Sequence, residues 1–207
     1  MAIRGIDVSH FQKTIDWEKV ANAGVQFAYA KASEGASFTD PMFVSNYAGI
    51  LGAGMLRGAY HFFDPGAAPL DQVAHFLKVL APAAPGDLPP MLDLESGGSK
   101  DRPAIVSGAL QWLDQVQKAV GRTPVLYCTA PFWTDVLGSP EALMEFPFWI
   151  AEYTLADKPT LPAKRASYAL WQYAQTGTVD GISTHVDLDW FNGSFDQLRQ
   201  LGVGAGG

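Results

Sequence analysis

Eight short runs rich in β-branched and aromatic residues recur along this 207-residue chain, and their spacing limits its possible folds more than any other feature. Each run has the length of a β-strand and is bounded by Gly, Pro or polar residues. The first five runs are separated by segments with helical spacing, whereas the last three follow one another without equivalent helices. The runs cover residues 5–10, 25–33, 55–63, 89–96, 123–129, 146–153, 168–175 and 185–191.

The clearest helical segment covers residues 102–121. Its apolar residues at positions 105, 109, 110, 113, 116 and 120 fall on one face, as in a helix that packs against a sheet. Pro103 suits the first turn of this helix, and Gly121 suits its C-terminal cap. Residues 40–54 and 68–81 are two further helical segments.

Strands that alternate with helices favour a parallel sheet, and eight of them favour closure into a barrel. Because the last three runs lack equivalent helices, we expect an α/β fold, an incomplete, flattened barrel of about eight strands. Hydrophobic residues make up 48% of the chain, enough for a full core in one domain. We assign this domain to residues 1–201 and interpret residues 202–207 as a Gly-rich tail.

The formal net charge of −7 argues against a nucleic-acid partner, because the 14 Lys and Arg residues form no cluster. The N-terminus has no secretory signal, and no stretch approaches the roughly 20 apolar residues that span a bilayer. We expect a monomer, synthesised in the cytoplasm without a Sec signal and not inserted into a membrane. The single cysteine, Cys128, lies in an apolar run and is interpreted as a small buried hydrophobic residue.

Polar residues gather where the strand runs end. In a barrel of this kind the catalytic groups lie at the C-terminal ends of the strands, so these positions are the candidates for a site. Carboxylates and aromatics are frequent among them. They are Asp7, Ser9, His10, Lys31, Glu34, Tyr60, His61, Asp64, Asp93, Glu95, Tyr127, Thr129, Glu152, Tyr153, Gln172, Tyr173, Asp187 and Asp189.

Asp93 and Glu95 are two residues apart, so on a strand both face one side, about 6 to 7 Å apart. Two carboxyl groups in one low-dielectric site raise the pKa of at least one of them. One protonated and one ionised carboxyl group is the arrangement that glycoside hydrolysis uses. A solvated strand end is the alternative for this pair, and a Mg²⁺ or Ca²⁺ site with Asp7 and Asp187 is another.

The four histidines lack the spacing of a zinc site, and no G-x-S-x-G, P-loop or G-x-G-x-x-G motif occurs. His75 lies in a helical segment and is interpreted as structural. His10 and His61 are either ligand contacts or core residues. The sequence therefore predicts no metal ion and no cofactor.

Several motifs, taken in order, resemble those of glycoside hydrolase family 25, the Chalaropsis-type lysozymes that act as N-acetylmuramidases. The resemblance runs from about Ile6 to Gly193, and it implies a flattened β/α barrel that cleaves the β-1,4 bond between N-acetylmuramic acid and N-acetylglucosamine. The motifs are "GIDVSHFQKTIDWEKVANAGVQFAYAKASEG", "GAYHFF", "PPMLDLES", "TPVLYCTAPFW", "FWIAEY", "LWQYAQTGTVDGI" and "VDLDWFNG".

The resemblance also implies roles for individual residues. Glu95 matches the general acid, Asp93 the second catalytic carboxylate, and Asp7 and Asp187 two further active-site aspartates. The family commonly has D-x-N on the last strand, where this chain has Asp189, whose role the resemblance leaves open. The implied substrate-binding residues are Glu34, Tyr60, Tyr127, Trp149, Tyr153 and Gln172.

The mechanism implied by these assignments starts with protonation of the glycosidic oxygen by Glu95. Ionised Asp93 then supports attack by the 2-acetamido oxygen of the substrate, with net retention. The substrate would be the glycan strands of peptidoglycan, in a cell wall reached by lysis or dedicated export. A non-catalytic peptidoglycan- or chitin-binding module and a hydrolase of chitin-like polymers are the alternatives.

Overall fold

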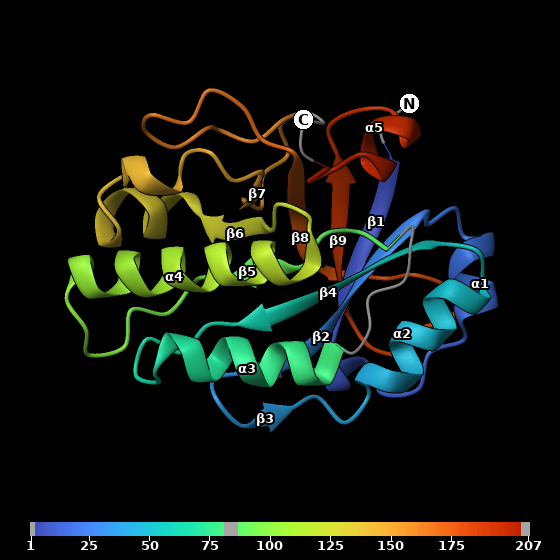
Figure 1. Cartoon of the computed structure of the whole chain (residues 1–207). Coiled ribbons are helices and arrows are strands. Elements are labelled where there is room, and N and C mark those ends of the chain that lie inside the picture. Colours follow the sequence, from blue (N-terminus) through green and yellow to red (C-terminus); the bar gives the residue numbers. More distant parts are fainter. Residues whose placement is uncertain (1–2, 81–86, 204–207) are drawn as a thin grey trace.

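The barrel wall is a single sheet whose strand order is β1-β9-β8-β7-β6-β5-β4-β2-β3, and pairing of β1 with β2 closes it (Figure 1). The computed structural model describes residues 3–80 and 87–203. The expected barrel of eight strands is confirmed, with β3 (Phe38–Thr39) as an extra strand at the edge. The eight are β1 (Ile3–Val8), β2 (Phe27–Glu34), β4 (Leu56–Phe62), β5 (Met91–Asp93), β6 (Val125–Thr129), β7 (Phe148–Ala151), β8 (Leu170–Gly177) and β9 (Val186–Phe191).

The last strand departs from the parallel arrangement expected from the sequence. Strand β9 runs antiparallel to both β1 and β8, while β1, β2 and β4 to β8 pair in parallel. Only residues 178–185 separate β8 from β9, which is too short for the crossover that a parallel neighbour requires. The barrel is therefore closed by a hairpin strand.

Helices cover the part of the wall formed by the early strands (Figure 1). The three expected helical segments are α2 (Phe43–Gly52), α3 (Pro69–Leu80) and α4 (Arg102–Val120). Asp101 caps the N-terminus of α4 by accepting a 3.0 Å hydrogen bond from the Ala104 backbone, and Gly121 caps its C-terminus at a φ of 70°. The shorter elements are α1 (Trp17–Asn22), α5 (Phe195–Arg199), η1 (His10–Gln12), η2 (Phe132–Val136) and η3 (Glu141–Leu143). Within the described ranges no helix combines the length and apolar character needed to cross a membrane.

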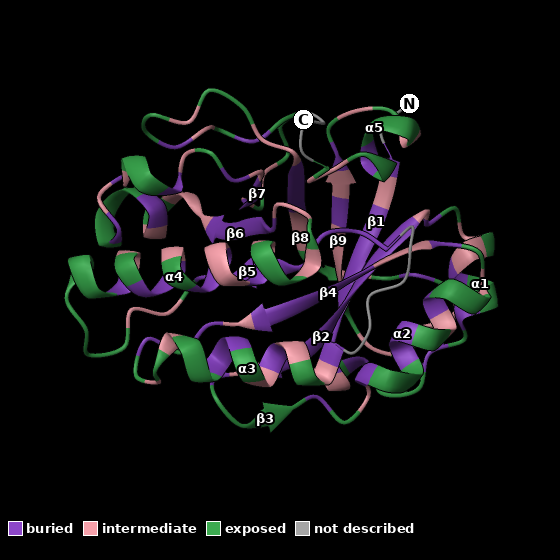
Figure 2. Ribbon diagram, in the orientation of Figure 1, coloured by how far each residue is buried: buried purple, intermediate pink, exposed green. Residues whose placement is uncertain are grey.

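Buried residues make up most of the barrel strands (Figure 2) and form two cores. The larger core lies between the wall and the helices. The smaller one fills the barrel, where the rings of Phe27 and Tyr29 occupy space that side chains at Gly5 and Gly58 would block. The interior of the barrel is therefore filled with side chains over most of its length.

The C-terminal segment lies against the other end of the barrel. The backbone nitrogen of Thr123 donates a 2.7 Å hydrogen bond to the carbonyl oxygen of Gly202. Residues 204–207, the rest of the expected tail, lie outside the described residues. Gly202, the first residue of the expected tail, is therefore hydrogen-bonded to the domain.

Candidate active site

A cavity of about 280 Å³ lies at the mouth of the barrel, where the parallel strands end. Eight of the ten predicted site residues line this mouth cavity, so the fold brings together side chains from most of the length of the chain. They are Asp7, Tyr60, Asp93, Glu95, Tyr127, Tyr153, Gln172 and Asp187.

Four carboxyl groups, here called the mouth carboxyl cluster, come from three strands. Asp7 on β1 and Asp187 on β9 lie directly opposite each other in the antiparallel ladder. Asp93 is the last residue of β5, and Glu95 follows just beyond the strand. Leu94 between them is fully buried on the other side, as the alternation predicts. Of the four, Asp7 and Asp93 are buried, whereas Glu95 is exposed in the cavity.

Burial raises the pKa of all four groups, and the charges of neighbouring carboxylates raise the pKa of Asp7, Asp93 and Asp187 further. Loss of solvation raises the pKa of Asp93 well above its ordinary value, and the charges of Glu95 and Asp7 add to this. Burial, followed by the charge of Asp187, does the same for Asp7. Burial and Glu95 raise the pKa of Asp187 to about 6. Partial desolvation also raises the pKa of Glu95, an effect that the Lys31 ammonium opposes. The cluster therefore holds protons at a pH where ordinary carboxyl groups have lost them.

Gln172 on β8 joins the aspartates to two tyrosines. Its Nε2 donates a 2.7 Å hydrogen bond to Oδ2 of Asp7. Its Oε1 accepts hydrogen bonds from the hydroxyls of Tyr153, at 2.7 Å, and Tyr127, at 2.9 Å. Burial raises the pKa of Tyr153 to about 12, so its hydroxyl keeps its proton. Gln172 thus fixes the orientation of Asp7 in addition to lining the cavity.

Lys31 lines the cavity, although no specific role was predicted for it from the sequence. Its Nζ forms a 2.6 Å ion pair with Oε2 of Glu34 and lies 4.8 Å from the centre of the Phe62 ring. Glu34, predicted to bind substrate, is therefore a partner of Lys31 and does not itself line the cavity. The positive charge of the ammonium group partly offsets the rise in the pKa of Asp93 and of Glu95.

Trp149 is the other predicted residue that the structure does not bring to the cavity wall. Its side chain is fully buried inside the barrel, where it packs edge-on against Tyr29 and Tyr127. The alternation of β7 correctly predicts an inward direction. Trp149 does not line the mouth cavity, and its contact with a substrate stays a prediction.

Asp189 lies one layer below the mouth, and its side chain is fully buried. It is paired with Gly5 on β1 and with Gln172 on β8. Neither of its carboxyl oxygens has a hydrogen-bond partner within residues 3–80 and 87–203. Burial, together with the charges of Asp7 and Asp187, raises its pKa well above the ordinary value. The burial of Asp189 beneath the mouth carboxyl cluster therefore favours its protonated form, an effect that the Trp149 side chain opposes.

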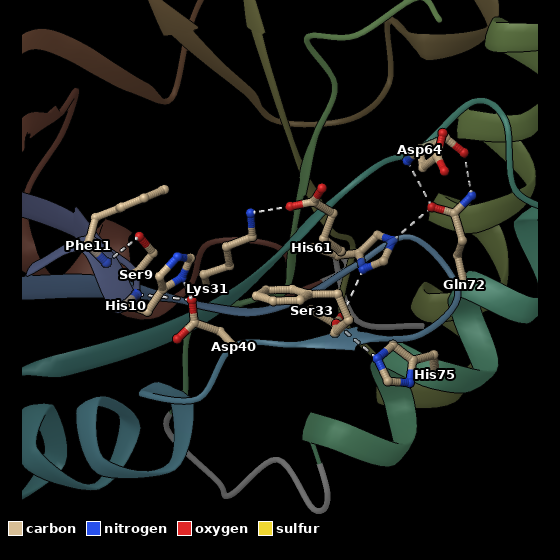
Figure 3. Close-up of polar contacts among 12 residues, drawn as sticks. Ser9, His10, Phe11, Lys31, Ser33, Asp40, His61, Asp64, Gln72 and His75 are labelled. Atoms are coloured by element: carbon tan, nitrogen blue, oxygen red, sulfur yellow. Dashed lines mark hydrogen bonds and ion pairs between the residues drawn. The ribbon is translucent and has the colours of Figure 1, made fainter. Parts of the chain in front are cut away.

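The histidines lie outside the cavity wall. His10 Nδ1 hydrogen-bonds to Oδ2 of Asp40 at 2.7 Å, and His75 hydrogen-bonds to the carbonyl oxygen of Phe38. His61 points away from the barrel interior, and the residues that hold it there, Ser33 and Gln72, complete what we call the His61 cluster (Figure 3). The interpretation of His61 as a core residue is the one that the structure supports.

The His61 cluster is saturated with hydrogen bonds. Gln72 Nε2 donates to the backbone carbonyls of Asp64, at 2.8 Å, and Ala67, at 3.2 Å, which leaves its Oε1 as an acceptor for His61 Nε2 at 3.0 Å. His61 Nδ1 then accepts from the Ser33 hydroxyl at 2.8 Å. Burial lowers the pKa of His61 to about 4, so the imidazole is neutral.

The segment after β1 brings to the cavity Ser9, which the sequence made a candidate, and two residues that the sequence did not predict. Phe11 and Gln12 line the mouth cavity, and 70% of the Phe11 side chain is exposed. Ser9 and Gln12 form a capping box around η1, a spacing that is visible in the sequence as S-x-x-Q. Within the described residues no group of three or more His, Cys, Asp or Glu side chains has the geometry to hold a metal ion.

Comparisons with known proteins agree on one family. The family model described as "Glycosyl hydrolases family 25" matches residues 6–182. Lysozyme M1 of Streptomyces globisporus is 35% identical, over 96% of this chain and 71% of that protein, and the N,O-diacetylmuramidase of Chalaropsis sp is 30% identical, over 98% and 100%. The crystal structure of the bacterial lysozyme from Streptomyces coelicolor superposes with a TM-score of 0.92 at 33% identity, covering 100% of this chain and 99% of that one.

Proposed function

The chain belongs to glycosyl hydrolase family 25 and is a glycoside hydrolase, and we propose that it is a lysozyme that cleaves the MurNAc-β-1,4-GlcNAc bond of peptidoglycan. One observation carries this proposal. Four carboxyl groups with raised pKa values converge on a cavity that is open to solvent at the barrel mouth. Glycoside hydrolysis requires such a set, in which one group donates a proton and another remains an anion.

Glu95 is the proposed general acid. It is the exposed member of the mouth carboxyl cluster, while Asp7 and Asp93 are less than one-tenth exposed. An acid must come within hydrogen-bond reach of the glycosidic oxygen, which favours the group that projects furthest into the cavity. Its raised pKa keeps a larger protonated fraction available near neutral pH.

Asp93 is proposed to orient the 2-acetamido group of the substrate. Its Oδ1 is buried and lacks a hydrogen-bond partner among the described residues. An unsatisfied buried acceptor is unfavourable, and the N–H of an acetamido group would satisfy it. That contact would favour the ionised form of Asp93 and direct the acetamido oxygen towards the anomeric carbon. Asp7, oriented by Gln172, and Asp187 are proposed to support the charge of this arrangement.

Attack by the acetamido group gives net retention without a covalent bond to the protein. Proton NMR of a short muropeptide glycan during hydrolysis reports the configuration of the first product. We expect the β-anomer to form first and to mutarotate later. Initial release of the α-anomer would contradict substrate assistance and retention.

The products also distinguish the proposed bond from its alternatives. Mass spectrometry of digested wall sacculi should show fragments with muramic acid at the reducing end. Fragments ending in N-acetylglucosamine, or cleavage of chitin in preference to peptidoglycan, would contradict the bond specificity. Binding of sacculi without any clearing would indicate a non-catalytic module.

A further inference from the structure

A second cavity, of about 610 Å³, lies against the outer face of β8 and β9. No helix follows β7 or β8 along the described chain, so this part of the wall lacks the crossover helix that covers the early strands (Figure 1). Its lining is dominated by aromatic side chains, so we call it the aromatic cavity. The residues that matter here are Asp157, Tyr168, Trp171, Tyr173, Trp190 and Asn192.

The aromatic side chains form a fixed platform. Trp171 and Trp190 lie opposite each other across the β8–β9 ladder. The rings of Tyr173 and Trp190 are stacked, with centres 5.3 Å apart and planes at 16°. Trp171 lies beneath, 5% exposed, with its Nε1 donating a 2.8 Å hydrogen bond to the Glu152 carbonyl oxygen. The rings therefore need little reorganisation to receive a ligand.

Polar side chains stand at the edge of this platform. Asp157 and Asn192 are exposed, and Asn192 Nδ2 donates a 3.1 Å hydrogen bond to the carbonyl oxygen of Tyr168. Binding sites for small organic groups combine apolar and aromatic walls with a few fixed polar groups. A hexosamine ring has C–H faces that pack on aromatic rings, and hydroxyl and amide groups that require polar partners at its edge. The chemistry of the cavity matches this type of ligand.

The aromatic cavity and the mouth cavity both share lining residues with a third cavity, of about 300 Å³. It shares Tyr153 and Gln175 with the mouth cavity, and Thr154 and Tyr173 with the aromatic cavity. The shared residues therefore place the three cavities in a series from the mouth carboxyl cluster to the aromatic platform.

We propose that the aromatic cavity binds a distal part of the same β-1,4-linked glycan strand whose reacting bond lies at the mouth. This inference rests on the proposed function, because it requires a polymeric hexosamine substrate. The third cavity provides the path of the strand between the two sites. The platform then contributes affinity for long strands and none for fragments that fill only the mouth.

The test measures binding to glycans of two lengths in a Glu95→Gln background, which prevents cleavage. The probes are peptidoglycan glycan strands freed of peptides, as long strands and as disaccharides. Trp190→Ala should weaken binding of the long strands about tenfold, close to 1.4 kcal/mol. It should leave binding of the disaccharide unchanged. Trp190→Phe should restore most of the loss, and Val44→Ala, an exposed apolar residue on α2, is the matched control.

Circular dichroism establishes that each variant is folded, and Tyr168→Ala replaces Trp190→Ala if the latter is not. Equal binding of long strands by Trp190→Ala and its parent, or equal losses for both lengths, would overturn the inference. The inference would also be overturned if Trp190→Ala lost self-association and not glycan binding, because the cavity would then be an interface with a second copy of the chain. If the wild-type protein does not clear sacculi, the proposed function itself fails. If the wild-type protein cleaves long strands and the Trp190→Ala variant cleaves them equally well, only the distal site is rejected.

Discussion

Two polar clusters lie on opposite faces of the same barrel wall, and they differ in how fully their hydrogen bonds are made. The His61 cluster, on the outer face, satisfies both ring nitrogens of His61 and both ends of the Gln72 amide. In the mouth carboxyl cluster, on the inner face, Oδ1 of Asp93 has no partner among the described residues, and neither oxygen of Asp189 beneath it has one. Buried polar groups are nearly always paired, so unpaired ones in a native protein require an explanation.

The two clusters also respond to pH in opposite ways. The pKa of His61 is lowered, so its contribution to stability is present above its unfolded value near 6.5 and is lost as the pH falls towards 4. The carboxyl groups have raised pKa values, so their contribution is present at low pH and is lost as the pH rises through the folded values. The comparison suggests that the His61 cluster stabilises the fold. The mouth carboxyl cluster lowers stability but retains protons for the proposed catalysis.

The largest expected effect is on catalysis by Glu95→Gln. The amide cannot donate the catalytic proton, and loss of a general acid lowers kcat by about 10²- to 10⁴-fold. The fold should remain, because Glu95 is exposed. Clearing of sacculi measures activity and thermal melting measures stability. Glu18→Gln, on the exposed face of α1, is the matched control. Comparable clearing by Glu95→Gln and the control would remove Glu95 from the mechanism.

The second effect belongs to the His61 cluster. Gln72→Ala removes the acceptor of His61 Nε2 and the donor to two backbone carbonyls. We expect a loss of about 3 kcal/mol in the free energy of unfolding, since buried groups are left unpaired. At a temperature where the variant is folded, kcat should stay within about twofold of wild type, because the cluster lies behind the barrel wall. Urea denaturation and a clearing assay measure the two quantities. A large loss of kcat with unchanged stability would reverse the roles of the clusters.

The smallest effect is expected for Asp189→Asn. The amide has no proton to lose, so the variant avoids the unfavourable ionisation of a buried carboxyl group. Above about pH 4, the unfolded wild type loses the proton that the folded state retains. The variant should therefore gain stability relative to wild type as the pH rises from 4 to 7. Urea denaturation at pH 4 and pH 7 tests the sign. A relative loss of stability at pH 7 would show that the ionised form of Asp189 is the one that the fold favours.

Much of this architecture is encoded locally and could be predicted. All eight expected strand runs are present, and α4 ends at Gly121 as its cap predicts. The direction of β9 could not be predicted from the runs alone, because the general pattern of alternation indicates parallel strands. The direction of β9 follows from the length of the segment between β8 and β9. That length is known only once the ends of both strands are known.

The site residues whose surroundings the sequence did not predict share one cause. Strand alternation shows which face of the sheet a side chain takes, but it does not show how deeply the side chain is buried or where a bulge interrupts the pattern. Trp149 faces inward as expected but is fully buried against Tyr29 and Tyr127 and does not line the mouth cavity. A bulge between Lys31 and Ser33 shifts the register of β2, so that Lys31 lines the mouth cavity and Ser33 bonds to His61 on the outer face. Neither the bulge nor the pairing of Lys31 with Glu34 has a sequence signal that strand periodicity detects.

The most direct test of the central claim is the titration of Glu95 itself. Carbon-13 NMR of its carboxyl carbon, in the wild-type protein without substrate, reports the midpoint of its ionisation. We predict a midpoint above the ordinary value of 4.5, and a further rise in Lys31→Met, where the opposing positive charge is absent. A midpoint at or below 4.5 in both proteins would show that the barrel mouth does not hold a proton on Glu95, and it would contradict the assignment of this residue as the acid.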